Sequence, residues 1–193
     1  MKSIALTGSI GSGKTLICSV FEQLGIPVFI ADKEALKCYN NIRFLEEIAS
    51  EFGSEVLDNK KLNKKALANI VFNDSNKLDK LNSMIHPKVL EMYLRQQEQH
   101  HNSPYTIMES AIIFEIGWEK KFDGIICIDS PKEVSIQRAM NRDKMSYEEV
   151  EQRFRNQLTN EEKVRRSDFV IHHDNKTMLL PQILEIHKMI TTE

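Results

Sequence analysis

Residues 8–15 have the residue types and spacing of a loop that binds phosphate groups. They fit the pattern G-x-x-x-x-G-K-[ST] and follow the apolar run 4–6. Glycines let the backbone turn its N–H groups toward an anion, and the helix that follows places its positive end at the same anion. Lys14 can reach the β- and γ-phosphates, and the Thr15 hydroxyl is a ligand for Mg²⁺. A ligand-free Gly/Ser turn would not need Lys and Thr at this spacing. We therefore expect a nucleoside triphosphate site formed by Gly8, Gly11, Ser12, Gly13, Lys14, Thr15 and Leu16.

A carboxylate follows the next apolar segment. Asp32 comes just after residues 27–30, and open α/β sheets bind their ligands at the carboxyl ends of the strands. There Asp32 could accept a proton from a hydroxyl, or orient that hydroxyl for in-line attack on a phosphate. It could equally cap a helix that begins at Lys33. Position alone leaves both roles open.

Arg138 and Arg142 lie one helical turn apart and so project from one face of a helix. Planar guanidinium groups pair with phosphate oxygens and neutralise the charge that develops on them during transfer. Glu133 and Asp143 are close by, so an ordinary solvated face is the alternative. Either interpretation fits the spacing.

Other polar residues carry weaker signals. Asp129 ends an apolar strand, as metal-binding aspartates do, but it is equally typical of a cap before the next helix. His86 precedes Pro87, and this pair is typical of helix initiation. The adjacent pairs His100-His101 and His172-His173 lack the i, i+4 spacing of a helical metal site. We therefore expect the paired histidines at the surface.

The composition limits the classes of partner. Lys and Arg total 26 against 28 Asp and Glu, so there is no net field that would favour nucleic acid. Cys18, Cys38 and Cys127 have no C-x-x-C spacing, which disfavours a zinc site and is typical of a reducing cytosol. No apolar run approaches the ~18 residues of a membrane helix. These features predict a cytoplasmic protein with no membrane partner, in which the cysteines fill apolar space.

Hydrophobic periodicity predicts alternating strands and helices. Short buried strands are expected at 2–7, 27–30, 105–109, 124–128 and 169–171. Helices are expected at 14–24, 35–40, 44–52, 64–72, 77–84, 87–99, 132–142, 148–158, 160–166 and 177–190. Ser146-x-x-Glu149 and Thr159-x-x-Glu162 have capping-box spacing. The fold class expected is α/β, a parallel five-stranded sheet flanked by helices, interrupted by a helical insertion over 33–101.

Taken together, these segments resemble the dephospho-CoA kinase family over nearly the whole chain. The phosphate loop is shared by many families, whereas the ordered set of motifs is much more specific. The marks are residues 6–15, Gly25-Ile26-Pro27-Val28 leading to Ala31-Asp32, Val71-Phe72, Ile85-His86-Pro87, Ile112-Ile113-Phe114-Glu115, Phe122-Asp123, Gln137-Arg138-x-x-x-Arg142-Asp143, Gln157 and Ser167-Asp168-x-Val170-Ile171.

The resemblance implies a single P-loop kinase domain over 1–193 that transfers a phosphoryl group from ATP, with Mg²⁺, to the ribose 3′-hydroxyl of dephospho-CoA. Asp32 becomes the expected base, and Lys14, Arg138 and Arg142 the other catalytic residues. The insertion 33–101 becomes the acceptor-binding part, with Asp32, Lys64 and His86 as acceptor residues. The arginines belong to a small helical lid over 138–158.

The sequence departs from the family pattern at a few positions. Lys64 stands where family members usually have Arg, which keeps the charge and loses the bidentate fork. Leu16 replaces a small hydroxyl residue, and Ser110-Ala111 replaces a Val-Pro or similar pair. His172-His173 stands where Asn is frequent near the adenine.

Two other functions remain open at this point. One is another small nucleoside or nucleotide kinase of the same architecture, which would differ in its acceptor pocket. The other is a regulatory switch that binds a nucleoside triphosphate. A switch would need a partner-binding loop, whereas the long helical insertion is what a kinase would use to hold an acceptor.

Overall fold

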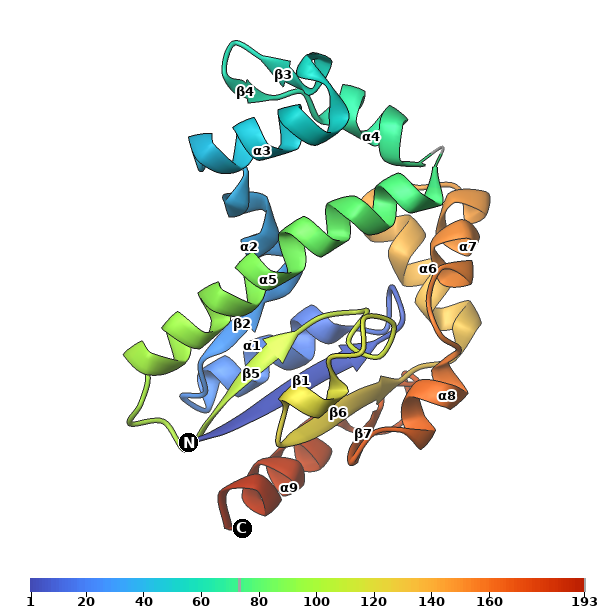
Figure 1. The fold of residues 1–193 in the computed structure, drawn as a ribbon. Helices are drawn as coiled ribbons and strands as arrows, with labels where there is room; N and C mark the ends of the chain where they lie inside the picture. Colours follow the sequence, from blue (N-terminus) through green and yellow to red (C-terminus); the bar gives the residue numbers. More distant parts are fainter. Residues whose placement is uncertain (73, 193) are drawn as a thin grey trace. The chain divides into compact units, whose positions relative to one another are not determined.

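The computed structural model describes residues 1–72 and 74–192 (Figure 1). The chain divides into two compact units, one made of Met1–Ile30 with Gln99–Glu193 and the other of Ala31–Glu98. Each unit is described by itself.

The first unit contains the parallel five-stranded sheet expected from the sequence (Figure 1). Its strand order is β2-β5-β1-β6-β7, and β1 pairs on both sides, with Ile4 opposite Ile107 of β5 and Gly124 of β6. The predicted strand positions hold to within one residue at each end. The strands are β1 (Lys2–Gly8), β2 (Val28–Ile30), β5 (Tyr105–Glu109), β6 (Gly124–Asp129) and β7 (Phe169–His172).

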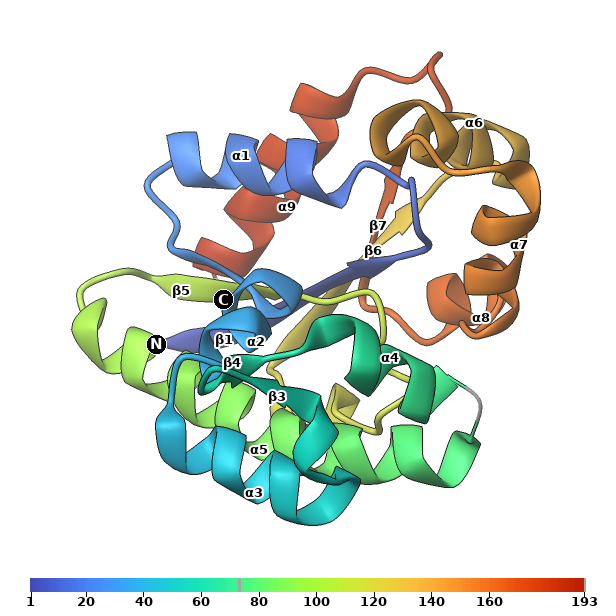
Figure 2. The ribbon, with the colours of Figure 1, turned by 90° about the horizontal axis from the view of Figure 1, so that it is seen from above.

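Helices cover both faces of this sheet. Helices α1 (Lys14–Gln23) and α9 (Leu179–Thr192) lie side by side (Figure 2) and bury one apolar cluster against the strands. Its members include Ile4, Leu6, Ile17, Phe21, Ile107, Ile126, Ile171, Ile183 and Ile190. Helix α8 (Asn160–Arg165) packs on β6 and β1, and the 3-10 turn η2 (Glu119–Lys121) precedes β6.

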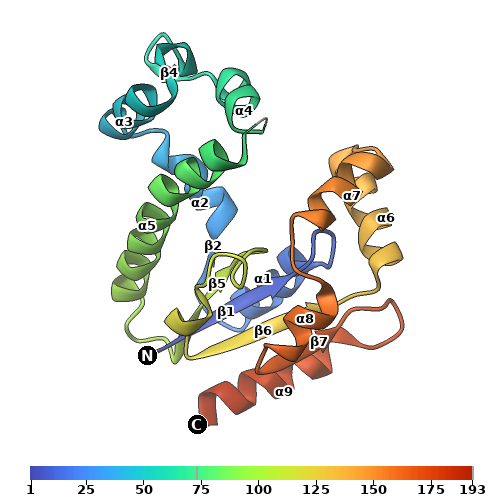
Figure 3. The ribbon, with the colours of Figure 1, turned by 45° about the vertical axis from the view of Figure 1, so that its right-hand side comes forward.

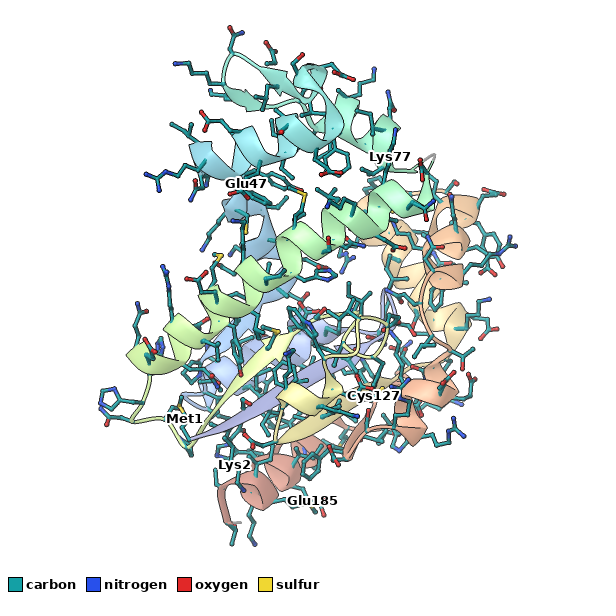
Figure 4. The ribbon with its side chains drawn as sticks, in the orientation of Figure 1. Met1, Lys2, Glu47, Lys77, Cys127 and Glu185 are labelled. Carbon is teal, nitrogen blue, oxygen red and sulfur yellow. The ribbon has the colours of Figure 1, made fainter. Side chains whose placement is uncertain are left out.

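The three cysteines are free and buried, as the sequence predicts. Cys127 lies on β6 (Figure 4), where burial raises the pKa of its thiol to about 11. Burial also raises the pKa of Cys18 and Cys38. The thiols therefore stay protonated near neutral pH, and they fill apolar space rather than act as nucleophiles.

Helices α6 (Lys132–Asp143) and α7 (Tyr147–Arg155) pack on each other after the carboxyl end of β6 (Figure 3). Ser146 and Glu149 form the predicted capping box: the Ser146 hydroxyl accepts from Glu149 N, and the Glu149 carboxylate accepts from Ser146 N. A small apolar cluster joins these helices to Ile10, which lies in the loop of residues 8–15. The other buried members of the cluster are Ile136, Ala139 and Val150. The packing thus couples α6 and α7 to that loop.

The second unit consists of helices and one short hairpin. Its elements are α2 (Ala31–Cys38), α3 (Ile42–Phe52), η1 (Ser54–Val56), β3 (Leu57–Asp58), β4 (Lys61–Leu62), α4 (Lys64–Phe72) and α5 (Ser75–Gln99). The hairpin is absent from the sequence-based expectation. Its two turn residues, Asn59 and Lys60, both have positive φ, as a type I′ turn requires, but Asn-Lys is a weak hairpin signal beside Asn-Gly.

Two local expectations in this unit are wrong. Pro87 lies inside the single helix α5, whereas two helices were expected with Pro87 opening the second. The buried residues Leu81, Val89 and Tyr93 lie on both sides of the proline, so apolar packing on both sides outweighs the hydrogen bond that proline removes. Asp32 is the second residue of α2, which begins at Ala31, so it is not the cap of a helix that starts at Lys33.

Within the described ranges, 1–72 and 74–192, no helix has the length and apolar character needed to cross a bilayer.

Candidate nucleotide-binding site

The phosphate loop (residues 8–15) joins the carboxyl end of β1 to the first turn of α1. Gly11 and Gly13 have positive φ values of 75° and 100°. A Cβ at Gly11 would collide with the carbonyl oxygen of Ser135 in α6, and one at Gly13 would collide with the imidazole of His173. Glycine is therefore required at both positions by backbone conformation and by close packing.

Lys14 folds back over the phosphate loop. Its Nζ donates to the carbonyl oxygens of Gly8 and Ser9 at 3.1 and 3.3 Å, and lies 3.8 Å from Glu109 Oε1 at the end of β5. The Lys14 and Glu109 side chains are only 12% and 8% exposed. The ammonium charge is thus held over the loop in a largely desolvated setting, where it interacts strongly with an anion.

The amino terminus of α1 is suited to an anion and a metal ion. Gly13 is its N-cap, and no side chain among the described residues caps it by a hydrogen bond. The first N–H groups of a helix lack partners within the helix, and they carry its partial positive charge. Thr15 is exposed in this first turn. Its hydroxyl is an oxygen ligand of the type that Mg²⁺ prefers.

Arg138 of α6 contacts the phosphate loop. Its Nη1 donates to the Ser12 carbonyl, the Ser130 hydroxyl and the His173 carbonyl, each at 3.4 Å. Its Nη2 donates to Asn175 Oδ1. Burial lowers the pKa of Arg138, although an arginine remains charged at any physiological pH. The structure thus brings the first of the two predicted arginines to the loop.

Arg142 makes different contacts from Arg138. Its Nε and Nη2 both donate to the Asp143 carboxylate at 2.8 Å, and its side chain is 59% exposed. This hydrogen bonding raises the pKa of Arg142 and lowers that of Asp143. An exposed ion pair is worth only about 0–1 kcal/mol, so Arg142 can leave Asp143 at little cost.

The carboxyl end of α7 is tied to the loop by side chains. Gln157 Oε1 accepts from the Ile10 N–H at 3.2 Å, and Glu115 Oε1 accepts from the Leu158 N–H at 2.8 Å. Glu115 also pairs at 2.9 Å with Lys163, whose side chain is fully buried. The residues that follow α7 are therefore anchored both to the phosphate loop and to the segment after β5.

Asp129 does not cap the helix that follows it, α6. Pro131 is the N-cap of α6, without a side-chain hydrogen bond, so Asp129 does not cap that helix. Its carboxylate accepts from Asn160 Nδ2 at 2.5 Å and lies 3.0 Å from His172 Nδ1. Within the described part of the chain, no cluster of three His, Cys, Asp or Glu side chains is arranged to hold a metal ion.

The remaining predicted site residues belong to the second unit. Asp32 is exposed in the first turn of α2, two residues beyond Ile30, which pairs with Glu109 in the sheet. His86 is half-buried in α5, and burial lowers its pKa. Lys64 is exposed at the first position of α4, directly after Asn63, whose side chain accepts from Ala66 N.

Lys64 borders a pocket that lies entirely within the second unit. The pocket has a volume of ≈ 200 Å³ and is otherwise lined by Leu36, Tyr39, Leu62, Leu67, Ala68, Val71 and Leu81. A lysine at the start of a helix opposes the helix dipole, so this position does not favour helix stability.

Sequence reasoning gave no site role to four residues that touch the predicted ones, and it expected one of them, His173, at the surface, whereas its ring packs on Gly13. Glu109 ends the apolar strand β5, and an acidic residue at the end of a strand beside β1 could have been found from the sequence. His173 and Asn175 meet Arg138 only because β7 ends beside the phosphate loop. Lys163 of α8 is buried and pairs with Glu115. Because α8 contains several charged residues, the sequence does not single out Lys163 as buried.

Comparison with known proteins agrees with this site. A family model described as "Dephospho-CoA kinase" matches residues 2–178. A "Dephospho-CoA kinase" from Bacteroides fragilis is 40% identical over 185 residues, covering 95% of this chain and 90% of the relative.

Two solved structures are similar to this chain over nearly its whole length. A structure titled "Dephospho-CoA kinase from Campylobacter jejuni" has a TM-score of 0.71 and 31% identity, covering 98% of this chain and 97% of that one. A second, titled "Crystal structure of TT1252 from Thermus thermophilus", has a TM-score of 0.85 and 30% identity, covering 99% and 96%. With a phosphate loop that binds both Lys14 and Arg138, and with this similarity over nearly its whole length, the chain belongs to the dephospho-CoA kinase family.

Proposed function

We propose that this chain transfers the γ-phosphoryl group of ATP to the ribose 3′-hydroxyl of dephospho-CoA, giving CoA and ADP, the last step of coenzyme A synthesis. The observation that carries the proposal is that the Lys14 ammonium and the Arg138 guanidinium are both anchored on carbonyl oxygens of one phosphate loop. Two cations on one loop suit charge that develops on a transferring phosphoryl group. Family membership favours this reaction over another nucleotide kinase or a regulatory switch.

Each residue has a distinct part in the proposed mechanism. The N–H groups of Gly8, Gly11, Ser12 and Gly13 in the phosphate loop, together with that of Leu16 in the first turn of α1, surround the phosphates of ATP. Lys14 neutralises charge at the β- and γ-phosphates, while Asp32 accepts or orients the proton of the attacking hydroxyl. Arg138 and Arg142 act as the arginines of a lid over 138–158, with Arg142 leaving Asp143 to reach the phosphates.

The donor set fits a Mg²⁺ ion that arrives with ATP. Mg²⁺ keeps several waters and takes one or two protein ligands together with phosphate oxygens, so it needs no dedicated carboxylate cluster. Thr15 supplies such an oxygen in the first turn of α1. A Mg²⁺ ion bound there would neutralise charge on the phosphates, and the rest of the chemistry falls to this chain's own residues.

The second unit is proposed to bind the acceptor, through Asp32, Lys64 and His86. Dephospho-CoA joins a charged diphosphate to a less polar pantetheine chain. The pocket beside Lys64 offers one cation and a largely apolar lining, which match those two parts. His86, whose pKa is lowered by burial, is uncharged near neutral pH and can donate or accept a hydrogen bond.

Three free, buried cysteines are typical of a protein in a reducing compartment, and we propose a cytoplasmic enzyme.

The function is tested by measuring ADP formation from Mg-ATP with dephospho-CoA, AMP or no acceptor. Dephospho-CoA should stimulate ADP formation far above the rate without acceptor, and AMP should be a poor substrate. Faster phosphorylation of AMP would identify a nucleotide kinase instead. Equal rates with and without any acceptor would point to the regulatory switch.

Replacing Lys64 by alanine is expected to raise the KM for dephospho-CoA roughly 10-fold, the effect of losing one charge-assisted hydrogen bond. The KM for ATP should stay nearly unchanged, and Lys64→Arg should equal or improve on the wild type because it restores a bidentate donor. Since Lys64 opposes the dipole of α4, Lys64→Ala should not lower the melting temperature.

Lys65→Ala is the matched control for Lys64, because it removes an exposed lysine from the same helical turn. It should leave both KM values unchanged. Equal effects of the two substitutions would mean that Lys64 supplies only general positive charge.

Changing Arg138 or Arg142 to alanine is expected to lower kcat more than it raises the KM for ATP, because both groups act mainly on charge formed in the transition state. For Arg138→Ala the loss in kcat should be roughly 10²-fold. Arg165 is an exposed arginine on α8, and the Arg165→Ala variant serves as the control in steady-state assays. Kinetics of both lid variants equal to this control would exclude the proposed lid.

A further inference from the structure

His173 stands where the edge strand β7 meets the phosphate loop, and its backbone is firmly held. Its N–H donates to the Asp129 carbonyl at 2.7 Å, which continues the pairing of β7 with β6 by one residue. The next residue, Asp174, accepts from the N–H groups of Lys176 and Thr177 at 2.9 and 2.8 Å. These bonds lower the pKa of Asp174 to about 2, so the turn keeps its carboxylate acceptor at physiological pH.

The imidazole of His173 contacts the phosphate loop and Arg138 at once. Its Nδ1 lies 2.7 Å from the Ser12 carbonyl oxygen, so we assign the ring proton to Nδ1, where it donates to that carbonyl. The ring also packs directly on Gly13, where a Cβ would collide with it. Nη1 of Arg138 donates to the backbone carbonyl of His173 and, like the imidazole Nδ1, to the Ser12 carbonyl, so the ring and the guanidinium share one acceptor. Nη1 and Nδ1 lie 3.0 Å apart, but no hydrogen bond joins them because both are donors.

A neutral ring suits this arrangement, because a protonated imidazole would place a second positive charge beside the Arg138 guanidinium. Burial lowers the pKa of His173, and the Arg138 charge lowers it further. The hydrogen bond to the Ser12 carbonyl and the Asp174 carboxylate raise it, but the net shift is downward. A group whose pKa lies below 6.5 is uncharged at neutral pH. The guanidinium therefore meets no like charge on the imidazole under assay conditions near pH 7.5.

We propose that His173 is a positioning residue for phosphoryl transfer, which fixes the Ser12 carbonyl of the phosphate loop and the Arg138 guanidinium of α6 in one arrangement. The inference rests on the proposed role of Arg138. Groups that stabilise a transition state work best when they are already in place, because no energy is then spent on reorganisation during the reaction. His173 links three separate elements at this point: the end of β7, the phosphate loop and α6.

The neighbouring histidine provides a matched control. His172 is 57% exposed, and its Nδ1 pairs with Asp129 rather than with the phosphate loop. Its backbone exchanges two hydrogen bonds with the Gln182 side chain of α9. It borders a cavity of ≈ 610 Å³ whose lining contains no residue of the phosphate loop. A change at His172 thus alters a similar side chain on the same strand end without touching the proposed contact.

The experiment compares kcat and the KM for ATP of the full chain in His173→Asn, His173→Gln, His173→Ala and His172→Asn. The Asn Nδ2 atom stands at the same bond separation from Cβ as the imidazole Nδ1, so His173→Asn should retain most of the wild-type kcat. In Gln the donor is one methylene farther away. His173→Gln and His173→Ala should lower kcat roughly 10- to 100-fold. His172→Asn should match the wild type.

A double-mutant cycle with Arg138→Ala separates positioning from general stability. If His173 acts through Arg138, adding His173→Ala to Arg138→Ala should lower kcat by less than about 2-fold further. Fully additive losses would overturn the inference, as would a wild-type kcat in both His173→Ala and His173→Gln. If Arg138→Ala itself leaves kcat unchanged, the proposed lid fails together with this inference. The cooperative melt of His173→Gln checks that the variant is folded.

Discussion

Replacing Lys14 by alanine is expected to lower kcat by roughly 10²–10³-fold, with the fold retained. The Lys14 ammonium is 12% exposed and held over the phosphate loop by the carbonyls of Gly8 and Ser9. In so desolvated a position it interacts strongly with charge that grows at the β- and γ-phosphates during transfer. Steady-state kinetics with saturating dephospho-CoA and Mg-ATP give kcat, and thermal unfolding reports on the fold.

The design needs a second variant at this position because Lys14 lies 3.8 Å from the buried Glu109 carboxylate. Lys14→Met keeps most of the apolar stem and lessens the loss of packing. Lys188→Ala removes an exposed lysine from α9 and controls for a change in net charge. A cooperative melt with near-wild-type kcat in both Lys14 variants would show that the loop does not work as a phosphate site.

Asp32→Asn is expected to keep ATP binding and to lower kcat by roughly 10²–10⁴-fold, the usual contribution of a positioned proton acceptor. Asparagine has nearly the same shape as aspartate but cannot take the proton of the ribose hydroxyl. The measurement is kcat with dephospho-CoA, together with the affinity for ATP in the absence of acceptor.

The position of Asp32 in α2 keeps the structural effect of this substitution small. Asp32 lies in the first turn, not at the cap, so losing its charge costs only the dipole interaction, typically 0.3–1 kcal/mol. Glu34→Gln, two residues farther along α2, removes a carboxylate that pairs with Lys37 and serves as the control. An unimpaired rate in Asp32→Asn would reduce Asp32 to a helix-terminal charge.

Local sequence signals were sufficient for much of this molecule. The buried strands are short apolar runs, and their parallel pairing follows from the strand-loop-helix order of residues 2–30. The capping box at Ser146 and Glu149 depends on residues three apart and formed as expected. The backbone conformation of the glycines in the phosphate loop is likewise determined locally. Their fixed spacing to Lys14 and Thr15 identifies the ligand class.

Local signals failed where a distant contact decided the outcome. Pro87 is a helix-start signal that packing on both sides overrides, because the apolar residues Leu81 and Val89 are buried in one continuous helix. The turn at Asn59 and Lys60 forms a hairpin too short to produce an alternating pattern. The pattern at Asp129 is typical of a cap for the next helix, but the Asp129 carboxylate instead contacts Asn160 and His172, which are more than thirty residues away in the sequence.

The sequence by itself determined the phosphate loop, the order of strands along the chain and the family, because each of these depends on residue types at fixed short spacing. Only the tertiary structure decided which side chains join that loop. Arg138 and Arg142 are equivalent in the helical pattern, yet one contacts Ser12 and the other pairs with Asp143. His173 reaches Ser12 across 161 positions because parallel strands bring their carboxyl ends to one edge of the sheet, a proximity that no local pattern encodes.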